Sequence, residues 1–198
     1  MKQGIIVFLN GTSSSGKTSI SIELKKQSEV PIYHLSVDDF CNGMFLNYID
    51  FINEIYPDLE PTAEEDGPKV AQIITNPMIS LYYSTIKLFS ALGMNVIVDT
   101  VIDQDECFNA CVDLLADHPI LFVGVTCSKE ELVRREQLRG DRNIGLAISQ
   151  YDKVYRFSDY DIEVNTETLK PNECASKIIN FIGSGQEGSA FIKLKRKQ

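Results

Sequence analysis

The sequence predicts an α/β protein, a three-layer sandwich in which helices cover both faces of a five-stranded parallel sheet. Two observations lead to this prediction. Short apolar runs rich in β-branched residues alternate with longer segments whose apolar residues recur at helical spacing. Continuous apolar runs are typical of strands that are buried on both faces, and the alternation implies crossover helices on either side of the sheet.

The predicted strands and helices follow one another along most of the chain. We expect strands at residues 4–9, 32–37, 95–99, 120–126 and 160–164. We expect helices from the end of a glycine-rich loop to about residue 27, at 40–56, from 69 or more surely 77 to 93, at 106–115, at 129–138 and at 171–182. Pro57 ends the second of these helices, Gly93 ends the third, and Pro171 opens the last.

The chain of 198 residues is about the size of one large domain. We expect that domain to cover residues 1–182. Within it, residues 58–68 are acidic and contain proline and glycine, which predicts an exposed excursion. Residues 183–198 are expected to form a flexible tail.

Composition restricts the class of partner. The net charge of −9 argues against general nucleic-acid binding, and no apolar run is long enough to span a membrane. The five cysteines show no C-x-x-C spacing, and the short apolar N-terminal run lacks a cleavage pattern. These features predict a cytoplasmic protein with reduced thiols and a small-molecule partner, and they leave the oligomeric state open.

One segment after the first predicted strand matches the phosphate-binding pattern G-x-x-x-x-G-K-[ST]. Its residues are Gly11, Thr12, Ser13, Ser14, Ser15, Gly16, Lys17 and Thr18. Backbone N–H groups of such a loop surround the phosphates of ATP, while the lysine contacts the β- and γ-phosphates and the threonine hydroxyl ligates Mg²⁺. A plain connecting turn would not place Lys17 at the positive end of a helix dipole, so we predict a P-loop NTPase fold of the nucleoside-kinase type.

Two aspartates follow predicted strands at the edge of the sheet where ligands of this fold bind. Asp38 follows the second strand and Asp99 ends the third. Either could accept a proton from a hydroxyl or hold Mg²⁺ through water. The alternatives are that Asp38 caps the helix that follows it, and that Asp99 caps a turn, although Asp99 also fits the magnesium-binding aspartate of P-loop proteins.

Arg135, Arg139 and Arg142 are spaced to share one face of a helix, if that helix continues through Gly140. Stacked like charges repel one another unless a polyphosphate joins them, so we predict that residues 128–150 form an arginine-bearing lid over ATP. The alternative is a solvated face neutralised by acidic neighbours. Those neighbours are Glu130, Glu131, Glu136 and Asp141.

Several segments together resemble the chloramphenicol phosphotransferase family. They are LNGTSSSGKTS at 9–19, SVDDF at 36–40, VIVDTVI at 96–102, FVGVTCSKEELVRRE at 122–136, LRGDR at 138–142 and YDIEVNT at 160–166. The resemblance implies transfer of the ATP γ-phosphate to an alcohol, with Asp38 as the base and Lys17 as the loop lysine. It also matches the three arginines to the family's lid and Asp99 to the aspartate that ends the third strand.

The resemblance defines the acceptor molecule less closely than it defines the reaction. Residues 43–69 differ from the family's pattern, and this region helps line the acceptor pocket. Aromatic and apolar side chains between residues 40 and 51 could form such a pocket or belong to the core; they are Phe40, Met44, Phe45, Tyr48 and Phe51.

The alternative functions are another small P-loop kinase, acting on a nucleoside, sugar nucleotide or metabolite, and an ATP-binding regulator without an acceptor. A GTPase is disfavoured because no N-K-x-D segment follows the fourth strand.

Overall fold

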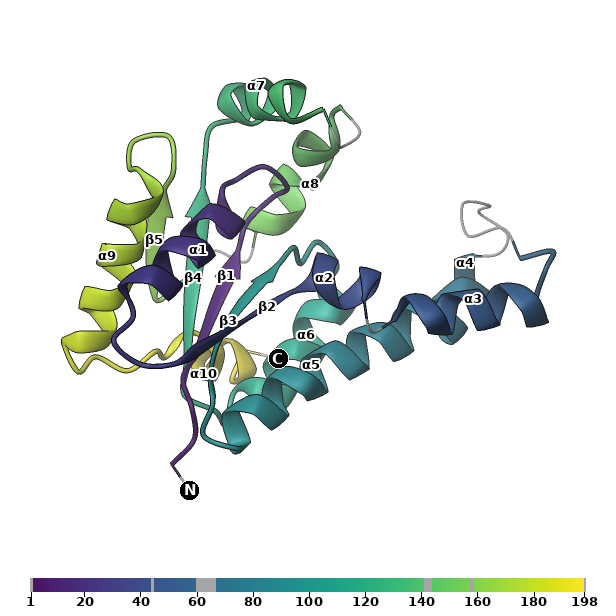
Figure 1. Ribbon diagram of the computed structural model, residues 1–198, viewed down its shortest axis with the longest axis horizontal. Coiled ribbons are helices and arrows are strands. Elements are labelled where there is room, and N and C mark those ends of the chain that lie inside the picture. Colours follow the sequence, from purple (N-terminus) through teal and green to yellow (C-terminus); the bar gives the residue numbers. More distant parts are fainter. Residues whose placement is uncertain (1, 44, 60–66, 141–143, 157–158, 198) are drawn as a thin grey trace.

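The computed structural model describes residues 2–43, 45–59, 67–140, 144–156 and 159–197. Five parallel strands form one sheet, in the order β2-β3-β1-β4-β5 (Figure 1). The strands are β1 (Ile6–Asn10), β2 (Ile32–Ser36), β3 (Asn95–Thr100), β4 (Ile120–Thr126) and β5 (Ile162–Asn165). The predicted α/β class and the five-stranded parallel sheet are confirmed.

Helices cover both faces of the sheet (Figure 1). On one face lie α1 (Lys17–Gln27) and α9 (Pro171–Gly183), and on the other lie α5 (Asn76–Ala91), α6 (Asp105–Leu115) and α10 (Ala190–Lys195). Successive strand residues point to opposite faces, so β1 contributes to both cores. Val7 and Leu9 pack into the α1 side, while Ile6 and Phe8 pack into the α5 side, and all four side chains are fully buried.

The register of the strands brings the ends that carry the predicted site residues together. In the sheet Asn10 is paired with Thr100, and Ser36 is paired with Asp99. The phosphate loop leaves β1 at this edge, and the segment containing Asp38 leaves β2 there. Parallel strands thus place three separate sequence motifs at one edge of the sheet.

The helix predicted at 40–56 is two helices, α2 (Val37–Asn42) and α3 (Leu46–Ile55). Gly43 closes α2 with its N–H bonded to Asp39 and with ψ near −84°, outside the helical region. Glycine is a poor helix former because its backbone loses the most freedom in a helix. An apolar pattern at helical spacing continues across such a break, which is why the sequence predicts one helix where the structure has two.

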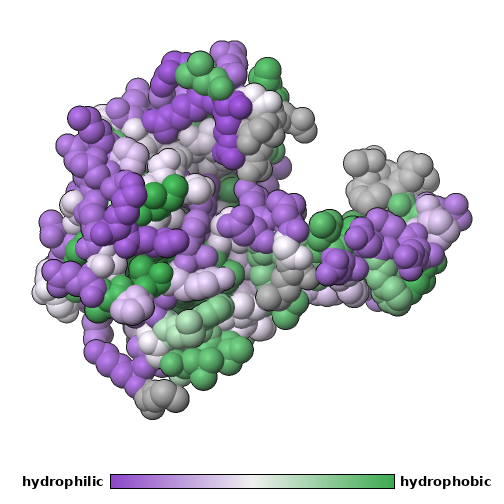
Figure 2. Space-filling view, viewed as in Figure 1, coloured by the Kyte–Doolittle hydropathy of each residue, from purple (hydrophilic) through white to green (hydrophobic). Residues whose placement is uncertain are grey.

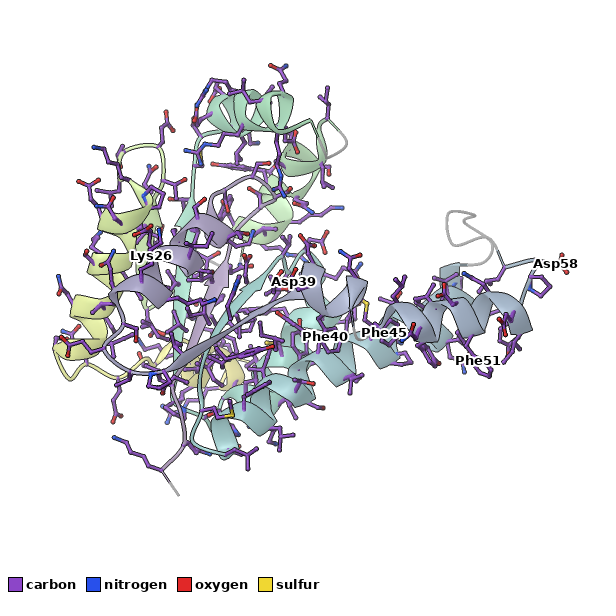
Figure 3. The ribbon with its side chains drawn as sticks, viewed as in Figure 1. Lys26, Asp39, Phe40, Phe45, Phe51 and Asp58 are labelled. Carbon is purple, nitrogen blue, oxygen red and sulfur yellow. The ribbon has the colours of Figure 1, made fainter. Side chains whose placement is uncertain are left out.

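The aromatic side chains of this region divide between core and surface. Phe40 and Phe45 are buried against the sheet, whereas Phe51 is 55% exposed on α3 (Figure 3). Apolar residues are also exposed along the projecting α3 arm, where Figure 2 shows green patches. Tyr48 is exposed as well, and Met44 lies outside the described residues. The described members of this set do not line the cavity described below.

The projecting arm consists of α3 and the start of a long helical run that lies beside it. This run consists of α4 (Gly67–Val70), a π-helical segment η2 (Ala71–Thr75) and α5, in agreement with the helix predicted from residue 69. Pro77 lacks the N–H that would bond the carbonyl of Ile73 in an α-helix. The hydroxyl of Tyr48 donates to that carbonyl at 3.1 Å, which ties α3 to the run (Figure 1). Part of the predicted 58–68 excursion, residues 60–66, lies outside the described residues.

The expectation of a flexible tail at 183–198 is corrected by helix α10. Phe191 is fully buried and packs against Phe8 and Phe122. One carboxylate oxygen of Asp161 accepts hydrogen bonds from the N–H groups of Ser189 and Ala190, which fixes the first turn of the helix. A single large aromatic residue and a cap from Asp161, just before β5, therefore order this segment, and neither is evident from local composition.

We predict that Phe191→Ala lowers the free energy of unfolding by about 3–5 kcal/mol, because it leaves a cavity in the core. Denaturant unfolding measures this change. Ile192→Ala is the matched control, since its side chain is 43% exposed in the same helix. Equal small losses for the two variants would contradict the packed position of α10.

Candidate active site

A cavity of about 590 Å³ opens at the edge of the sheet where the predicted motifs meet. It is lined by residues from the phosphate loop, α2, the end of β3 and the segment that follows β4. The predicted site residues on its wall are Ser13, Ser14, Gly16, Lys17, Thr18, Asp38, Asp99, Arg135 and Arg139. Gly11, Thr12 and Ser15 belong to the same loop but lie behind this wall, and all three are buried.

The loop between β1 and α1 has the backbone geometry of an anion cradle. Ser14 and Gly16 both have positive φ, at 61° and 99°, so the chain curls tightly before α1 begins. A Cβ on Gly11 would lie 2.5 Å from the carbonyl oxygen of Val125, so that position requires glycine. The hydroxyls of Ser14 and Ser15 are buried and have no hydrogen-bond partner among the described residues. Buried donors that lack a partner are expected where a phosphate binds.

Lys17 lies within the loop and is only 7% exposed. Its Nζ donates to the carbonyl oxygens of Gly11 at 3.0 Å and Thr12 at 2.9 Å, and it lies 3.9 Å from a carboxylate oxygen of Asp99. These contacts offset the cost of a buried cation at the positive end of α1. The ammonium is held at the mouth of the loop, where β- and γ-phosphates would lie.

Asp99 and Thr18 form the pair that was predicted to hold magnesium. The Thr18 hydroxyl donates to Oδ2 of Asp99 at 2.7 Å, and Nε2 of His34 lies 3.7 Å from the same oxygen. Burial by itself would raise the pKa of Asp99, but His34, Lys17 and Thr18 outweigh it and hold the pKa below its usual range. The carboxylate is therefore ionised at neutral pH, as a magnesium site requires.

His34 was not predicted as a site residue. It precedes Ser36 by two positions in β2, so the two side chains share one face of the sheet with Asp99, which is paired with Ser36. A histidine three residues before the predicted strand end at residue 37 was the signal that could have identified it.

Asp38 lies in the first turn of α2, exposed, on the wall of the cavity. The alternative role for Asp38 was to cap α2. That cap is provided by Ser36, whose hydroxyl accepts a hydrogen bond from the N–H of Asp39 at 3.4 Å. Asp38 is therefore not the cap. Asp39, the next residue in the same turn, does not line the cavity.

The arginine motif lies on α7 (Lys129–Arg139), which ends at Gly140 with φ of 68°. The helix does not continue through Gly140, so the shared helix face extends only from Arg135 to Arg139, and both residues line the cavity. Arg142 lies outside the described residues. Arg134 points elsewhere and forms a surface ion pair with Glu131.

Arg135 is built into the wall of the site. Its guanidinium donates to the hydroxyl and the carbonyl oxygen of Thr166, each at 2.9 Å, and lies at 3.5 Å from the carbonyls of Ser14 and Ser15. Hydrogen bonds from Arg134 and Arg135 lower the pKa of Glu131 to about 2, so Glu131 remains an anion that orients both arginines. Arg135 thus links α7, the phosphate loop and the loop after β5.

The helix α8 (Leu146–Tyr155) was not predicted, although Leu146, Ala147, Tyr151 and Val154 have helical spacing. Glu136 anchors its start. The carboxylate of Glu136 is fully buried and accepts hydrogen bonds from the N–H groups of Gly145 at 2.9 Å and Ala147 at 2.6 Å. For Glu136 the solvated-face alternative is therefore wrong. The sequence gives no direct signal for such a cap, because its partners lie beyond the helix that carries it.

The site fits ATP with magnesium but not a metal held by protein alone. Within the described ranges, no group of three or more His, Cys, Asp or Glu residues could hold a metal ion. Thr18 and Asp99 could supply two oxygen ligands, and in P-loop proteins phosphate oxygens and water complete the magnesium sphere. In the part of the chain that the structure describes, no helix has the length and apolar character needed to cross a membrane.

Comparisons with solved structures give the same fold. The APS kinase of Mycobacterium tuberculosis, solved with AMPPNP and APS, is similar with a TM-score of 0.67 and 16% identity, over 92% of this chain and 99% of that one. A gluconokinase from Sinorhizobium meliloti is similar with a TM-score of 0.54 and 14% identity, over 93% of this chain and 98% of that one. At these identities the likeness concerns the fold alone.

Sequence comparison adds the family. A protein of Mycobacterium tuberculosis with the provisional name O-phosphotransferase is 27% identical over 203 residues, covering 100% of this chain and 90% of that protein. The model of the family described as chloramphenicol phosphotransferase-like protein matches residues 4–183. This match includes the phosphate loop, both aspartates and the arginines of α7. The chain belongs to the chloramphenicol phosphotransferase-like family.

Proposed function

We propose that this protein transfers the γ-phosphate of ATP to a hydroxyl group of a small molecule, with Asp38 as the base. The observation that carries the proposal is one cavity that combines a phosphate loop with a candidate base. Lys17, Thr18 and Asp99 lie on one part of its wall, and Asp38 lies on another. The five cysteines are free thiols, which agrees with a reducing cytoplasm, where ATP is available.

The proposed reaction is a direct displacement at phosphorus. The loop N–H groups and Lys17 hold the β- and γ-phosphates, and Asp38 accepts the proton of the acceptor hydroxyl as its oxygen attacks the γ-phosphorus. The bond from that phosphorus to the β,γ-bridging oxygen breaks, and ADP leaves. Arg135 and Arg139, together with Arg142 outside the described residues, offset negative charge on the transferred group.

Magnesium would be held by the Thr18 hydroxyl and, directly or through water, by Asp99. When bound, it neutralises charge on the β- and γ-phosphate oxygens. Thr18 and Asp99 are already hydrogen-bonded to each other at 2.7 Å, so the two ligands are in place before the ion arrives.

The charges on the cavity wall favour an uncharged acceptor. Among the described lining residues, the cations are Lys17, Arg135 and Arg139, which come from the phosphate loop and α7. The described lining residues at the ends of β2 and β3 and just after them include no cation; they are Ser36, Val37, Asp38, Asp99, Thr100 and Val101. Asp38 and Asp99 make this part of the wall negative, which repels an acceptor that carries phosphate or carboxylate. This supports a neutral alcohol such as chloramphenicol over an anionic metabolite.

We predict that Asp38→Asn keeps ATP binding but lowers turnover by at least about 10²-fold, because the amide cannot accept the hydroxyl proton. Calorimetry of ATP binding and acceptor-dependent ADP release measure the two effects separately. Asp39→Asn is the matched control, since it removes an equal charge from the same turn outside the cavity. Normal turnover in Asp38→Asn would remove Asp38 from the role of base.

A further inference from the structure

A glutamine of α8 contacts the phosphate loop. The N–H of Ser13 donates to Oε1 of Gln150 at 2.9 Å. A backbone N–H can only donate, so this bond fixes which end of the carboxamide faces the loop. Oε1 accepts the Ser13 N–H, so the NH₂ group, which can only donate, is the other end of the carboxamide and is directed away from that N–H. Among the described residues, that NH₂ group has no hydrogen-bond partner.

Gln150 lies on the same cavity wall as Lys17 and Arg139. The Ser13 N–H belongs to the part of the loop just before the tight curl at Ser14 and Gly16. A donor held there is next to the space that the terminal phosphate of ATP would occupy. A phosphate oxygen accepts hydrogen bonds from amide donors, and such a bond to a charged group is stronger than one between neutral groups.

The helix that carries Gln150 is held firmly enough to position it. Glu136 caps the first turn of α8, and Ala147 packs with Leu132 and Cys127 in a small buried cluster. Near the end of the helix, the hydroxyl of Tyr155 donates to the carbonyl of Val125 at 2.8 Å. α8 is thus attached to α7 at one end and to β4 at the other, and Gln150 lies between the two attachments.

We propose that Gln150 binds the γ-phosphate of ATP: its oxygen stays on the Ser13 N–H while its NH₂ group donates to the terminal phosphate. Through this contact the enzyme distinguishes ATP from ADP, and the oriented phosphate is presented to the acceptor. The inference rests on the proposed use of ATP as phosphate donor. The competing interpretation is structural, in which Gln150 only satisfies the N–H of Ser13.

Gln150→Glu separates these two roles because it keeps an oxygen for the Ser13 N–H and replaces the donor with a negative charge. We expect the Kd for AMPPNP to rise about 10- to 100-fold, as for a lost hydrogen bond to a charged group, while the Kd for ADP changes less than about 3-fold. Gln150→Ala should show the same selectivity without an added charge. Titration calorimetry with AMPPNP and with ADP, each in the presence of magnesium, measures both constants.

Ser149→Glu is the matched control, since it adds the same charge to the neighbouring, exposed position of α8. Its AMPPNP to ADP ratio should equal that of the wild type. A uniform loss of both nucleotides in the Gln150 variants, or no loss in either, would overturn the proposal in favour of the structural role. Wild-type protein that binds neither nucleotide would overturn both this proposal and the proposed function. Selective loss of AMPPNP without acceptor-dependent turnover would leave the role of Gln150 standing and contradict only the proposed transfer.

Discussion

Replacing Lys17 with alanine is expected to abolish phosphoryl transfer, with turnover lowered by at least about 10³-fold. The Lys17 ammonium is held by the carbonyls of Gly11 and Thr12 at the mouth of the loop, so it is positioned before ATP binds. Charge builds up between the β- and γ-phosphates as the bond between them breaks, and a fixed cation stabilises that charge without reorganisation. No other described lysine lines the cavity to replace it.

The Lys17 variant needs two comparisons. Lys17→Met keeps most of the stem of the side chain and should lose activity as fully as Lys17→Ala, which separates loss of charge from loss of packing. Lys26→Ala, on the exposed side of the same helix, should have normal turnover (Figure 3). Thermal unfolding checks that each variant is folded. A folded Lys17→Ala enzyme with turnover within about tenfold of the wild type would contradict the assigned role of the loop.

Arg139→Ala is expected to lower turnover by about 10³- to 10⁵-fold with folding intact, as for loss of a cation that stabilises the transferred phosphoryl group. Arg139 is exposed at the last turn of α7 and lines the cavity, so it contributes little to the core. Its partner on the same helix face, Arg135, is bonded to Thr166 and Glu131 and has a larger part in holding the wall together. Arg139 is therefore the cleaner test of the charge.

Arg134→Ala is the matched control for this prediction. It removes the same charge from the same helix, but its guanidinium is paired with Glu131 at the surface and does not line the cavity. Steady-state kinetics at saturating ATP compares the two variants. If Arg139→Ala and Arg134→Ala behave alike, the arginines of α7 are a solvated face rather than part of a lid.

The sheet could be predicted from sequence because its signal is local. Strands buried on both faces need continuous apolar residues, and β4 was predicted with the bounds that the structure has. The burial of Phe191 depends instead on contacts between distant segments. The break at Gly43 is local, but the apolar spacing that continues across it hides it. Nothing near Phe191 in the sequence indicates that Asp161, on the approach to β5, caps its helix.

The parts of the site that carry sequence motifs could be predicted. The phosphate loop and Asp99 have fixed positions relative to predicted strands, so strand pairing was enough to bring them together. Gln150 and Glu136 were missed because both depend on α8, which was not predicted: Gln150 brings α8 into contact with the phosphate loop, and Glu136 joins α7 to the start of α8. Side chains that act through a neighbouring helix leave no spacing pattern in the sequence.

The most direct test of the proposed transfer is ADP release from magnesium-ATP by the purified protein, with and without alcohols. The panel pairs neutral alcohols, including chloramphenicol and nucleosides, with phosphorylated or carboxylated ones. We predict release that depends on a neutral alcohol, with one phosphate appearing on that alcohol for each ADP. If chloramphenicol is the acceptor, the activity in the family's name extends to this chain; another neutral alcohol would keep the mechanism and change the substrate. ATP binding without release in the presence of any alcohol would contradict the account and favour an ATP-binding regulator.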